Sequence, residues 1–150
     1  MIYLKAFVYS FLATLGFAIL FHSPKRSILP ACLSSGLSWL VYEYLQISGV
    51  NYIFSAFASA FLIGIFGEFL SRRLKKPATV FILPGLIPLV PGAGMYYSMN
   101  SLINQDYNSF MTVGVKTFFT ALALSFGLVV SSTFSNSLRH ARERKQNSRI

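Results

Sequence analysis

The sequence predicts an all-α integral membrane protein whose chain crosses the bilayer about five times. Of its 150 residues, 54% are hydrophobic and only 11% are charged, whereas a soluble domain carries about 25% charged residues. The apolar residues gather in long runs, and each run approaches the ~20 residues that a helix needs to cross the hydrocarbon core. Basic residues cluster between these runs, and one run is interrupted by several prolines and glycines. These observations indicate a multi-span membrane protein with one broken span.

The net charge of +9 has a pattern that favours a membrane over a nucleic acid. Eleven of the 13 lysines and arginines fall into three short clusters, which hydrophobic runs separate as the positive-inside rule expects. We therefore expect a lipid bilayer as a partner and no nucleic acid. The single cysteine, Cys32, excludes an internal disulfide and argues against a cysteine-based zinc site.

The first two spans follow from their length and from the residues at their ends. The first runs from about Ile2 to Phe21. Lys5 before an apolar run is also typical of a signal peptide, but no small-residue cleavage site follows, so we expect a retained span. The second runs from about Ile28 to Ile47, with Pro30 in its first turn, where proline is tolerated best. Its serines and glycine predict a small, polar face that packs against another helix.

The remaining unbroken spans are the third and the fifth. The third runs from about Tyr52 to Leu70 and the fifth from about Met111 to Thr133. Serine and glycine recur along the third at near-helical spacing, which again predicts close helix packing. We therefore divide the chain into a five-span membrane domain, residues 1–135, and a basic cytoplasmic tail, residues 136–150.

The three basic clusters set the expected topology. Each cluster follows an odd-numbered span or precedes an even-numbered one, and lysine and arginine concentrate on the cytoplasmic side of membrane proteins. Five spans therefore place the N-terminus outside and the C-terminus in the cytoplasm. An odd number of spans also permits a homologous partner that enters from the opposite side, as in inverted-repeat transporters.

The fourth expected span, about Ala78 to Leu102, contains the interrupted stretch LPGLIPLVPGAGMYYS at residues 83–98. Each proline removes a backbone donor and clashes with the carbonyl four residues earlier, and each glycine costs about 1 kcal/mol relative to alanine. Six such residues within eleven positions predict that the helix unwinds between about Pro84 and Gly94. A second half-helix is then expected to start near Gly94. The alternative is a kinked but continuous helix that only packs tightly.

The string FILPGLIPLVPGAGMYYSM at residues 81–99, within a basic-flanked five-span chain, resembles the small membrane subunit of the threonine/serine exporter family. Its most specific element is the PG-x-x-PLVPG core at residues 84–92. The resemblance implies a larger homologous partner subunit, which has a cytoplasmic domain and its own, inverted set of membrane spans. It also implies export of threonine and serine, or of a dicarboxylate such as succinate in some split pairs.

The broken span supplies the candidate substrate-binding residues. Unpaired backbone groups are tolerated at membrane depth only where they line a cavity or contact protein, and a helix N-terminus attracts a carboxylate. Two side chains on the second half-helix, Ser98 and Asn100, are candidates for binding an ammonium or hydroxyl group. Their alternative is ordinary interhelical hydrogen bonding or exposure at the outer interface. The predicted substrate-binding residues are Pro84, Gly85, Pro88, Pro91, Gly92, Gly94, Ser98 and Asn100.

Two ionisable side chains, Glu43 and Lys116, are expected about one turn inside the outer membrane face. A charge within a span costs several kcal/mol and usually has a partner or a water-filled cavity. We predict that they form a charge pair or share the substrate path, with Glu43 as the candidate carrier of a coupling proton. The alternative is that both extend to the nearby interface. Thr117 and Thr120 either line a path or bond to their own helix backbone.

No enzyme is expected from this sequence. Its two histidines lie far apart, and it contains no Ser/His/Asp set, metal cluster or nucleotide fingerprint. We predict no catalytic residue, no metal and no cofactor. The predicted function is that of a membrane subunit of a secondary exporter for small carboxylate-bearing metabolites, in the bacterial inner membrane and with a larger partner. The alternative is a non-transporting scaffold that stabilises a partner membrane protein.

Overall fold

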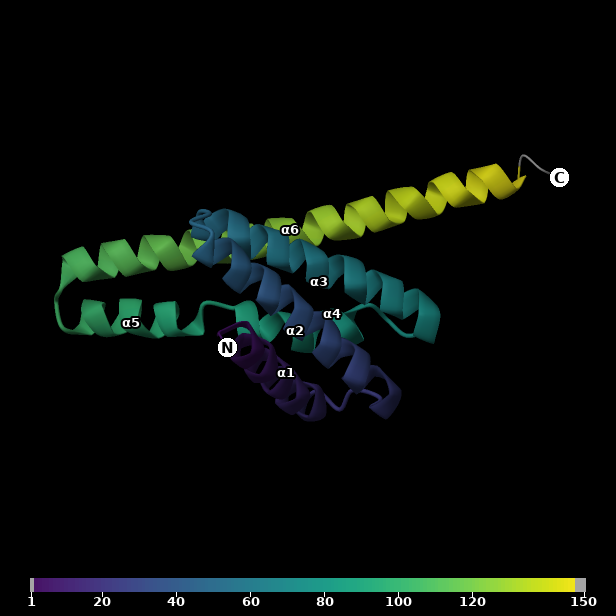
Figure 1. Cartoon of the computed structure of the whole chain (residues 1–150). Coiled ribbons are helices and arrows are strands. Elements are labelled where there is room, and N and C mark those ends of the chain that lie inside the picture. Colours follow the sequence, from purple (N-terminus) through teal and green to yellow (C-terminus); the bar gives the residue numbers. More distant parts are fainter. Residues whose placement is uncertain (1, 148–150) are drawn as a thin grey trace.

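The structure is a computed structural model that describes residues 2–147, and this part of the chain consists of helices joined by short turns (Figure 1). The prediction of an all-α chain is therefore confirmed for these residues. The predicted boundary at residue 135 lies within the last helix, and residues 148–150 of the predicted tail lie outside the described residues. The elements in order are α1 (Ile2–Leu20), α2 (Lys25–Ile47), α3 (Tyr52–Leu74), α4 (Thr79–Leu86), the 3-10 turn η1 (Ile87–Leu89), α5 (Gly92–Ile103) and α6 (Tyr107–Asn147).

Three of the described helices, α1, α3 and α6, are long and apolar enough to cross a membrane, and a fourth crossing results if the bent pair of α4–η1 and α5 forms one span. The second expected span, α2, has a sufficient length of 23 residues but is not among these apolar helices. It is less apolar than the others because serine and glycine occupy its buried positions. The five-span count and the outside N-terminus therefore stay predictions.

The helices pack as a bundle in which α2 lies between α1 and α3, α3 packs along α6, and α4 fits against both α2 and α3. Two glycines allow α3 and α6 to approach closely. A Cβ added at Gly127 on α6 would lie 2.5 Å from the carbonyl oxygen of Phe57, and one at Gly64 on α3 would collide with Ser131. Since both contacts advance in the same direction along the two helices, α3 and α6 are parallel, as the third and fifth spans of the expected topology are.

The break in the fourth span is confirmed, but it is shorter than predicted. Only Val90 and Pro91 leave the helical conformation, and the axes on either side of them differ by 48°. The prediction that unwinding starts near Pro84 is wrong, because α4 continues through Pro84 to Leu86. The second half-helix begins at Gly92, two residues before the predicted start.

A buried hydroxyl cluster supplies a hydrogen-bond donor where α4 passes into η1. The Ser35 hydroxyl donates to the carbonyl oxygen of Gly85 at 3.0 Å and accepts from the Thr14 hydroxyl at 2.7 Å. The Ser10 hydroxyl lies 3.0 Å from Ser35 Oγ. In a 3-10 turn the Gly85 carbonyl would pair with the nitrogen of Pro88, which has no hydrogen to donate. The cluster thus supplies the missing donor and joins α1, α2 and α4.

Replacing Ser35 with alanine is expected to destabilise the fold by about 1–3 kcal/mol, because the Gly85 carbonyl and the Thr14 hydroxyl then lose a buried partner. Thermal unfolding of the purified protein in detergent measures this effect. The matched control is Ser125→Ala, since the exposed Ser125 hydroxyl only donates to its own helix at the carbonyl of Ala121. Equal melting temperatures for the two variants would contradict the role of the cluster.

Because α2 is less apolar than the other long helices, the five-span topology needs an experimental test. Cys32 is buried and is first replaced by alanine, and single cysteines are then placed at Ser48, Lys76 and Asn104, which are all exposed. The five-span topology predicts labelling by a membrane-impermeant maleimide at Ser48 and Asn104 in intact cells, and labelling at Lys76 only after the cells are opened. If Ser48 and Lys76 react alike, α3 does not cross the membrane as expected.

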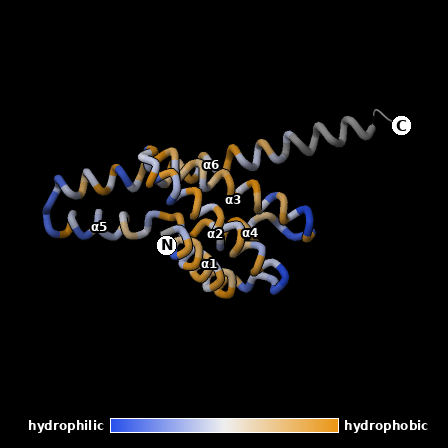
Figure 2. Tube along the Cα trace, in the orientation of Figure 1, coloured by the Kyte–Doolittle hydropathy of each residue, from blue (hydrophilic) through white to orange (hydrophobic). Residues whose placement is uncertain are grey.

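The last two helices form a hairpin that extends beyond the rest of the bundle, seen at the left of Figure 1. Its tip is hydrophilic (Figure 2), and Asp106 caps α6 by accepting a hydrogen bond from the Ser109 amide at 3.1 Å. Hydrogen bonds from Ser109 hold the pKa of Asp106 below its ordinary value. The carboxylate is therefore charged at neutral pH and complements the positive N-terminal end of α6.

Candidate functional site

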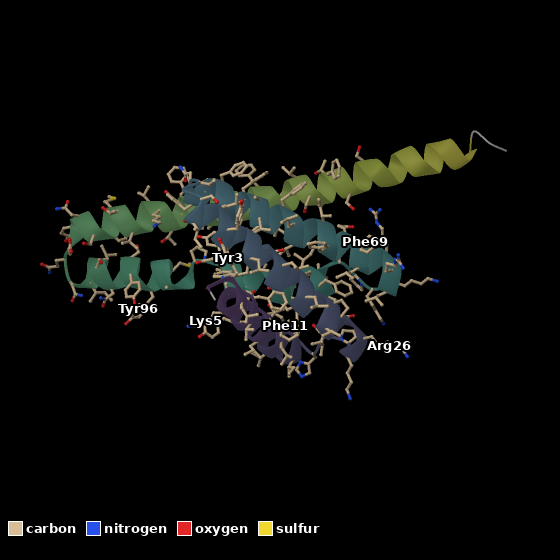
Figure 3. The ribbon with its side chains drawn as sticks, in the orientation of Figure 1. Tyr3, Lys5, Phe11, Arg26, Phe69 and Tyr96 are labelled. Atoms are coloured by element: carbon tan, nitrogen blue, oxygen red, sulfur yellow. The ribbon has the colours of Figure 1, made fainter. Side chains whose placement is uncertain are left out.

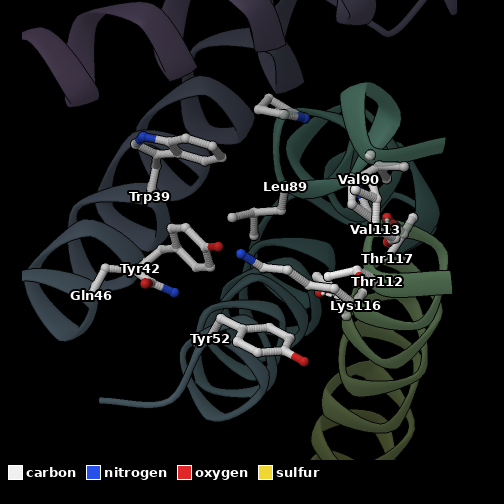
Figure 4. Close-up of a pocket in the computed structure, with 14 residues that line it drawn as sticks. Trp39, Tyr42, Gln46, Tyr52, Leu89, Val90, Thr112, Val113, Lys116 and Thr117 are labelled. Atoms are coloured by element: carbon white, nitrogen blue, oxygen red, sulfur yellow. Dashed lines mark hydrogen bonds between the residues drawn. The ribbon is translucent and has the colours of Figure 1, made fainter. Parts of the chain in front are cut away.

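A cavity of about 550 Å³ lies beside the break between α4–η1 and α5 (Figure 4). One of its walls comes from α2 and the start of α3, and the opposite wall comes from α6. Residues 88–91, which include the non-helical backbone, form the third wall. The cavity is thus built where the sequence predicts an interrupted helix to line a binding site.

Three of the eight predicted substrate-binding residues, Pro88, Pro91 and Gly94, line this cavity. Proline is accommodated here because the chain leaves the helical conformation at residues 90–91. Gly94 lies where α5 touches α6, and a Cβ added there would collide with the hydroxyl of Thr117. Glycine is therefore required at this position if α5 is to approach α6 beside the cavity.

The other five predicted residues lie outside the cavity lining. Pro84 and Gly85 are buried within the bundle, and Gly92 borders open space, with no atom within 4 Å of an added Cβ. Ser98 faces α6, where a Cβ added at Gly114 would lie 2.9 Å from its hydroxyl oxygen. Asn100 is exposed. The structure thus places Ser98 in a helix contact and leaves Asn100 on the surface.

Among the described residues that line the cavity, Lys116 is the one charged side chain. It extends from α6 toward Tyr42 and Leu89 (Figure 4). Its Nζ lies 5.1 Å from the ring centroid of Tyr52, and such a cation–π contact contributes about 0.5–2 kcal/mol. The ammonium group is therefore held at the cavity by an aromatic neighbour that does not neutralise its charge.

Glu43 does not join Lys116 in this conformation. It is half-buried on α2 but is not among the residues that line the cavity, and the recorded neighbour of the Lys116 ammonium is Tyr52. The predicted charge pair of Glu43 and Lys116 stays a prediction. A role for Glu43 in carrying a coupling proton stays a prediction.

The sequence reasoning missed the wall that α2 provides. Trp39, Tyr42 and Gln46 line the cavity together, and the rings of Trp39 and Tyr42 lie 5.4 Å apart. Their spacing of three and four residues places them on one face of a helix. This stripe was the signal that could have found them, since it lies near the outer end of the expected second span.

The two threonines on α6 fulfil both alternatives that the sequence leaves open. Thr117 and Thr120 line the cavity, and their hydroxyls donate to the carbonyls of Val113 and Lys116 at 2.7 and 2.8 Å. Each hydroxyl oxygen can still accept a hydrogen bond. The site therefore offers one cation, several neutral polar groups and three aromatic rings, without a carboxylate in its lining. This arrangement suits a small ligand that carries a carboxylate.

The comparisons with known proteins identify a family and two relatives. Residues 6–134 match the family model described as threonine/serine exporter, ThrE. A probable threonine/serine exporter of Mycobacterium tuberculosis is 28% identical over 120 residues, which cover 79% of this chain and 23% of that protein. A Haemophilus influenzae protein described as uncharacterized is 23% identical over 131 residues, covering 82% of this chain and 44% of that protein. No solved structure matches the chain.

The chain spans less than half the length of either of these relatives. The family match nevertheless includes every helix that the structure describes, from α1 into α6, and the whole of the cavity lining. The family model is described as one of exporters, which are transport proteins. From its helical fold, its interrupted span and this match, the chain belongs to the threonine/serine exporter family.

Proposed function

We propose that this chain is a membrane subunit of a secondary exporter for small carboxylate-bearing metabolites, which acts with a larger partner subunit in the bacterial inner membrane. The observation that carries the proposal is the cavity at the helix break, with Lys116 as the charged group of its lining. A substrate carboxylate would accept hydrogen bonds from this ammonium group, and threonine, serine and a dicarboxylate such as succinate all carry one.

The cavity lies near one end of the bundle, which supports a mechanism of alternating access. Gln46 and Tyr52, which flank the α2–α3 connection, line it, and the predicted topology places this connection outside the cell. On the other side of the break, the contact of Ser35 with the Gly85 carbonyl is buried. In the predicted topology this conformation would be open outward and closed toward the cytoplasm, and export would require that the Ser35 contact opens.

The proposal is tested by producing this chain in cells together with the candidate larger subunit and measuring efflux of labelled threonine, serine and succinate. Each chain produced alone provides the control. Efflux of at least one of these compounds that requires both chains supports the exporter. A correctly assembled pair that exports none of them would contradict the proposal and favour a scaffold that only stabilises its partner.

A further inference from the structure

The α5–α6 hairpin projects past the connection between α2 and α3 at residues 48–51. We call the resulting difference in level between the hairpin and this connection the step. The Lys116 side chain on α6 reaches the ring of Tyr52, the first residue of α3, and the contacts of Gly127 with Phe57 and of Gly64 with Ser131 place the backbone of Lys116 no deeper in the bundle than Tyr52. Gly94 near the start of α5 lies against Thr117. Residues 107–115 of α6 therefore extend past α3, which is about 14 Å at ~1.5 Å per residue. Figure 1 shows the same projection, with α5 and the start of α6 beyond the α2–α3 connection.

No single bilayer plane satisfies both levels of this step. If the α2–α3 connection marks the outer interface, the hairpin projects out of the hydrocarbon core with its apolar side chains uncovered. If the tip of the hairpin marks the interface, the connection at residues 48–51, with the exposed Ser48 and Asn51, lies about 14 Å inside. Polar backbone at that depth requires protein or water around it. Either arrangement calls for additional protein in the step.

One side of the step, which we call its wall, is the face of α5 that points away from α6. This face is apolar, and no other described helix covers it. The one substantial contact of α5 with another described helix is with α6. Figure 3 shows that Tyr96 points away from α6. Five large side chains of α5 are between 56% and 69% exposed: Met95, Tyr96, Tyr97, Met99 and Ile103. Aromatic and methionine side chains are enriched where proteins bind one another.

The other side of the step, which we call its floor, is the α2–α3 connection. Its polar groups favour a protein over lipid chains as the occupant of the step. The side-chain nitrogen of Gln46 is buried there without a hydrogen-bond partner, and Ser48 and Asn51 lie next to it in the sequence. The cavity with Lys116 occupies the corner between floor and wall, since its lining comes from α2, α3, α5 and α6. An occupant of the step would therefore also complete the lining of the cavity.

We propose that the larger subunit packs its membrane helices into this step, against α5 and over the α2–α3 connection, and thereby completes the lining of the substrate cavity. This inference rests on the proposed function. The relatives support this occupant, because the matched region makes up only 23% and 44% of their chains. The rest of those chains is long enough to contain additional membrane helices.

Photo-crosslinking tests this docking surface in the assembled membrane. Benzoylphenylalanine is introduced separately at Tyr96 and Met99 on the hairpin, in cells that also produce the tagged larger subunit. The matched control is Ile19, which lies near the C-terminal end of α1, away from the hairpin, and is 58% exposed. We expect a crosslink to the larger subunit at both hairpin positions that is at least several-fold stronger than at Ile19.

Three outcomes would overturn the proposal: a hairpin adduct with a second copy of this chain, no protein adduct at the hairpin, or equal crosslinking at Ile19. The efflux assay separates this inference from the proposed function. If the pair exports substrate but the hairpin positions do not crosslink to the larger subunit, the docking surface is wrong and the function stands. If they crosslink in a pair that exports nothing, the surface stands and the exporter function is wrong.

Discussion

Replacing Gly94 with leucine is expected to reduce export to the background of cells that lack the chain. A Cβ at this position would collide with Thr117, and the rest of the leucine side chain would have to enter the cavity or push α5 away from α6. Overpacking of this kind costs about 1–3 kcal/mol, which corresponds to roughly 5–150-fold in binding. Efflux of labelled substrate from cells that produce both subunits measures the effect.

The matched control is Gly16→Leu, which adds the same volume on α1, where no atom lies within 4 Å of an added Cβ. This variant is expected to export normally because its side chain enters open space. Co-purification of the larger subunit shows whether each variant still assembles. Normal export by an assembled Gly94→Leu variant would show that substrate does not use this cavity.

Replacing Lys116 with methionine is expected to weaken the apparent affinity for a carboxylate substrate by about 10–150-fold. A hydrogen bond to a charged group contributes about 1.5–3 kcal/mol, and each 1.4 kcal/mol is a factor of ten in affinity. Methionine retains an unbranched apolar chain, and removing a charge from a membrane span does not by itself destabilise the helix. The measurement is the dependence of the efflux rate on the internal substrate concentration.

Two further variants separate the role of charge at Lys116 from that of general surface charge. Lys116→Arg keeps the cation and is expected to retain part of the affinity, although its planar group does not reproduce a compact ammonium. Lys76→Met removes an exposed cation from the other end of α3 and is expected to leave the affinity unchanged. If Lys76→Met and Lys116→Met have the same effect, Lys116 is not a binding group.

Most of the helical architecture follows from local properties of the sequence. Apolar runs of sufficient length predict α1, α3 and α6, and the prolines and glycines around Pro91 predict the interruption between α4 and α5. Lys116 was recognisable because a charge is costly within an apolar run. Each of these inferences depends on residues that are close together in the chain.

The features that the sequence did not reveal depend on contacts between distant segments. The donor that the Gly85 carbonyl receives at the end of α4 is the hydroxyl of Ser35, which is 50 residues away in the sequence. The step depends on the register between α3 and α6, which is set where Gly127 meets Phe57. Because periodicity gives the face of a helix but not its level relative to a neighbour, neither feature could be predicted from the sequence alone.

The most direct test of the central proposal, that substrate binds in the cavity at the helix break, is protection of a cysteine in its lining. In the Cys32→Ala background, the Thr112→Cys thiol is labelled with an impermeant maleimide in the assembled pair, with and without saturating substrate. Thr112 lines the cavity and is exposed, and the Asn104→Cys variant at the hairpin tip is the control. We predict that substrate slows labelling at Thr112 several-fold and leaves labelling at Asn104 unchanged. Equal labelling rates at Thr112 with and without substrate, in a pair that exports it, would contradict the proposal.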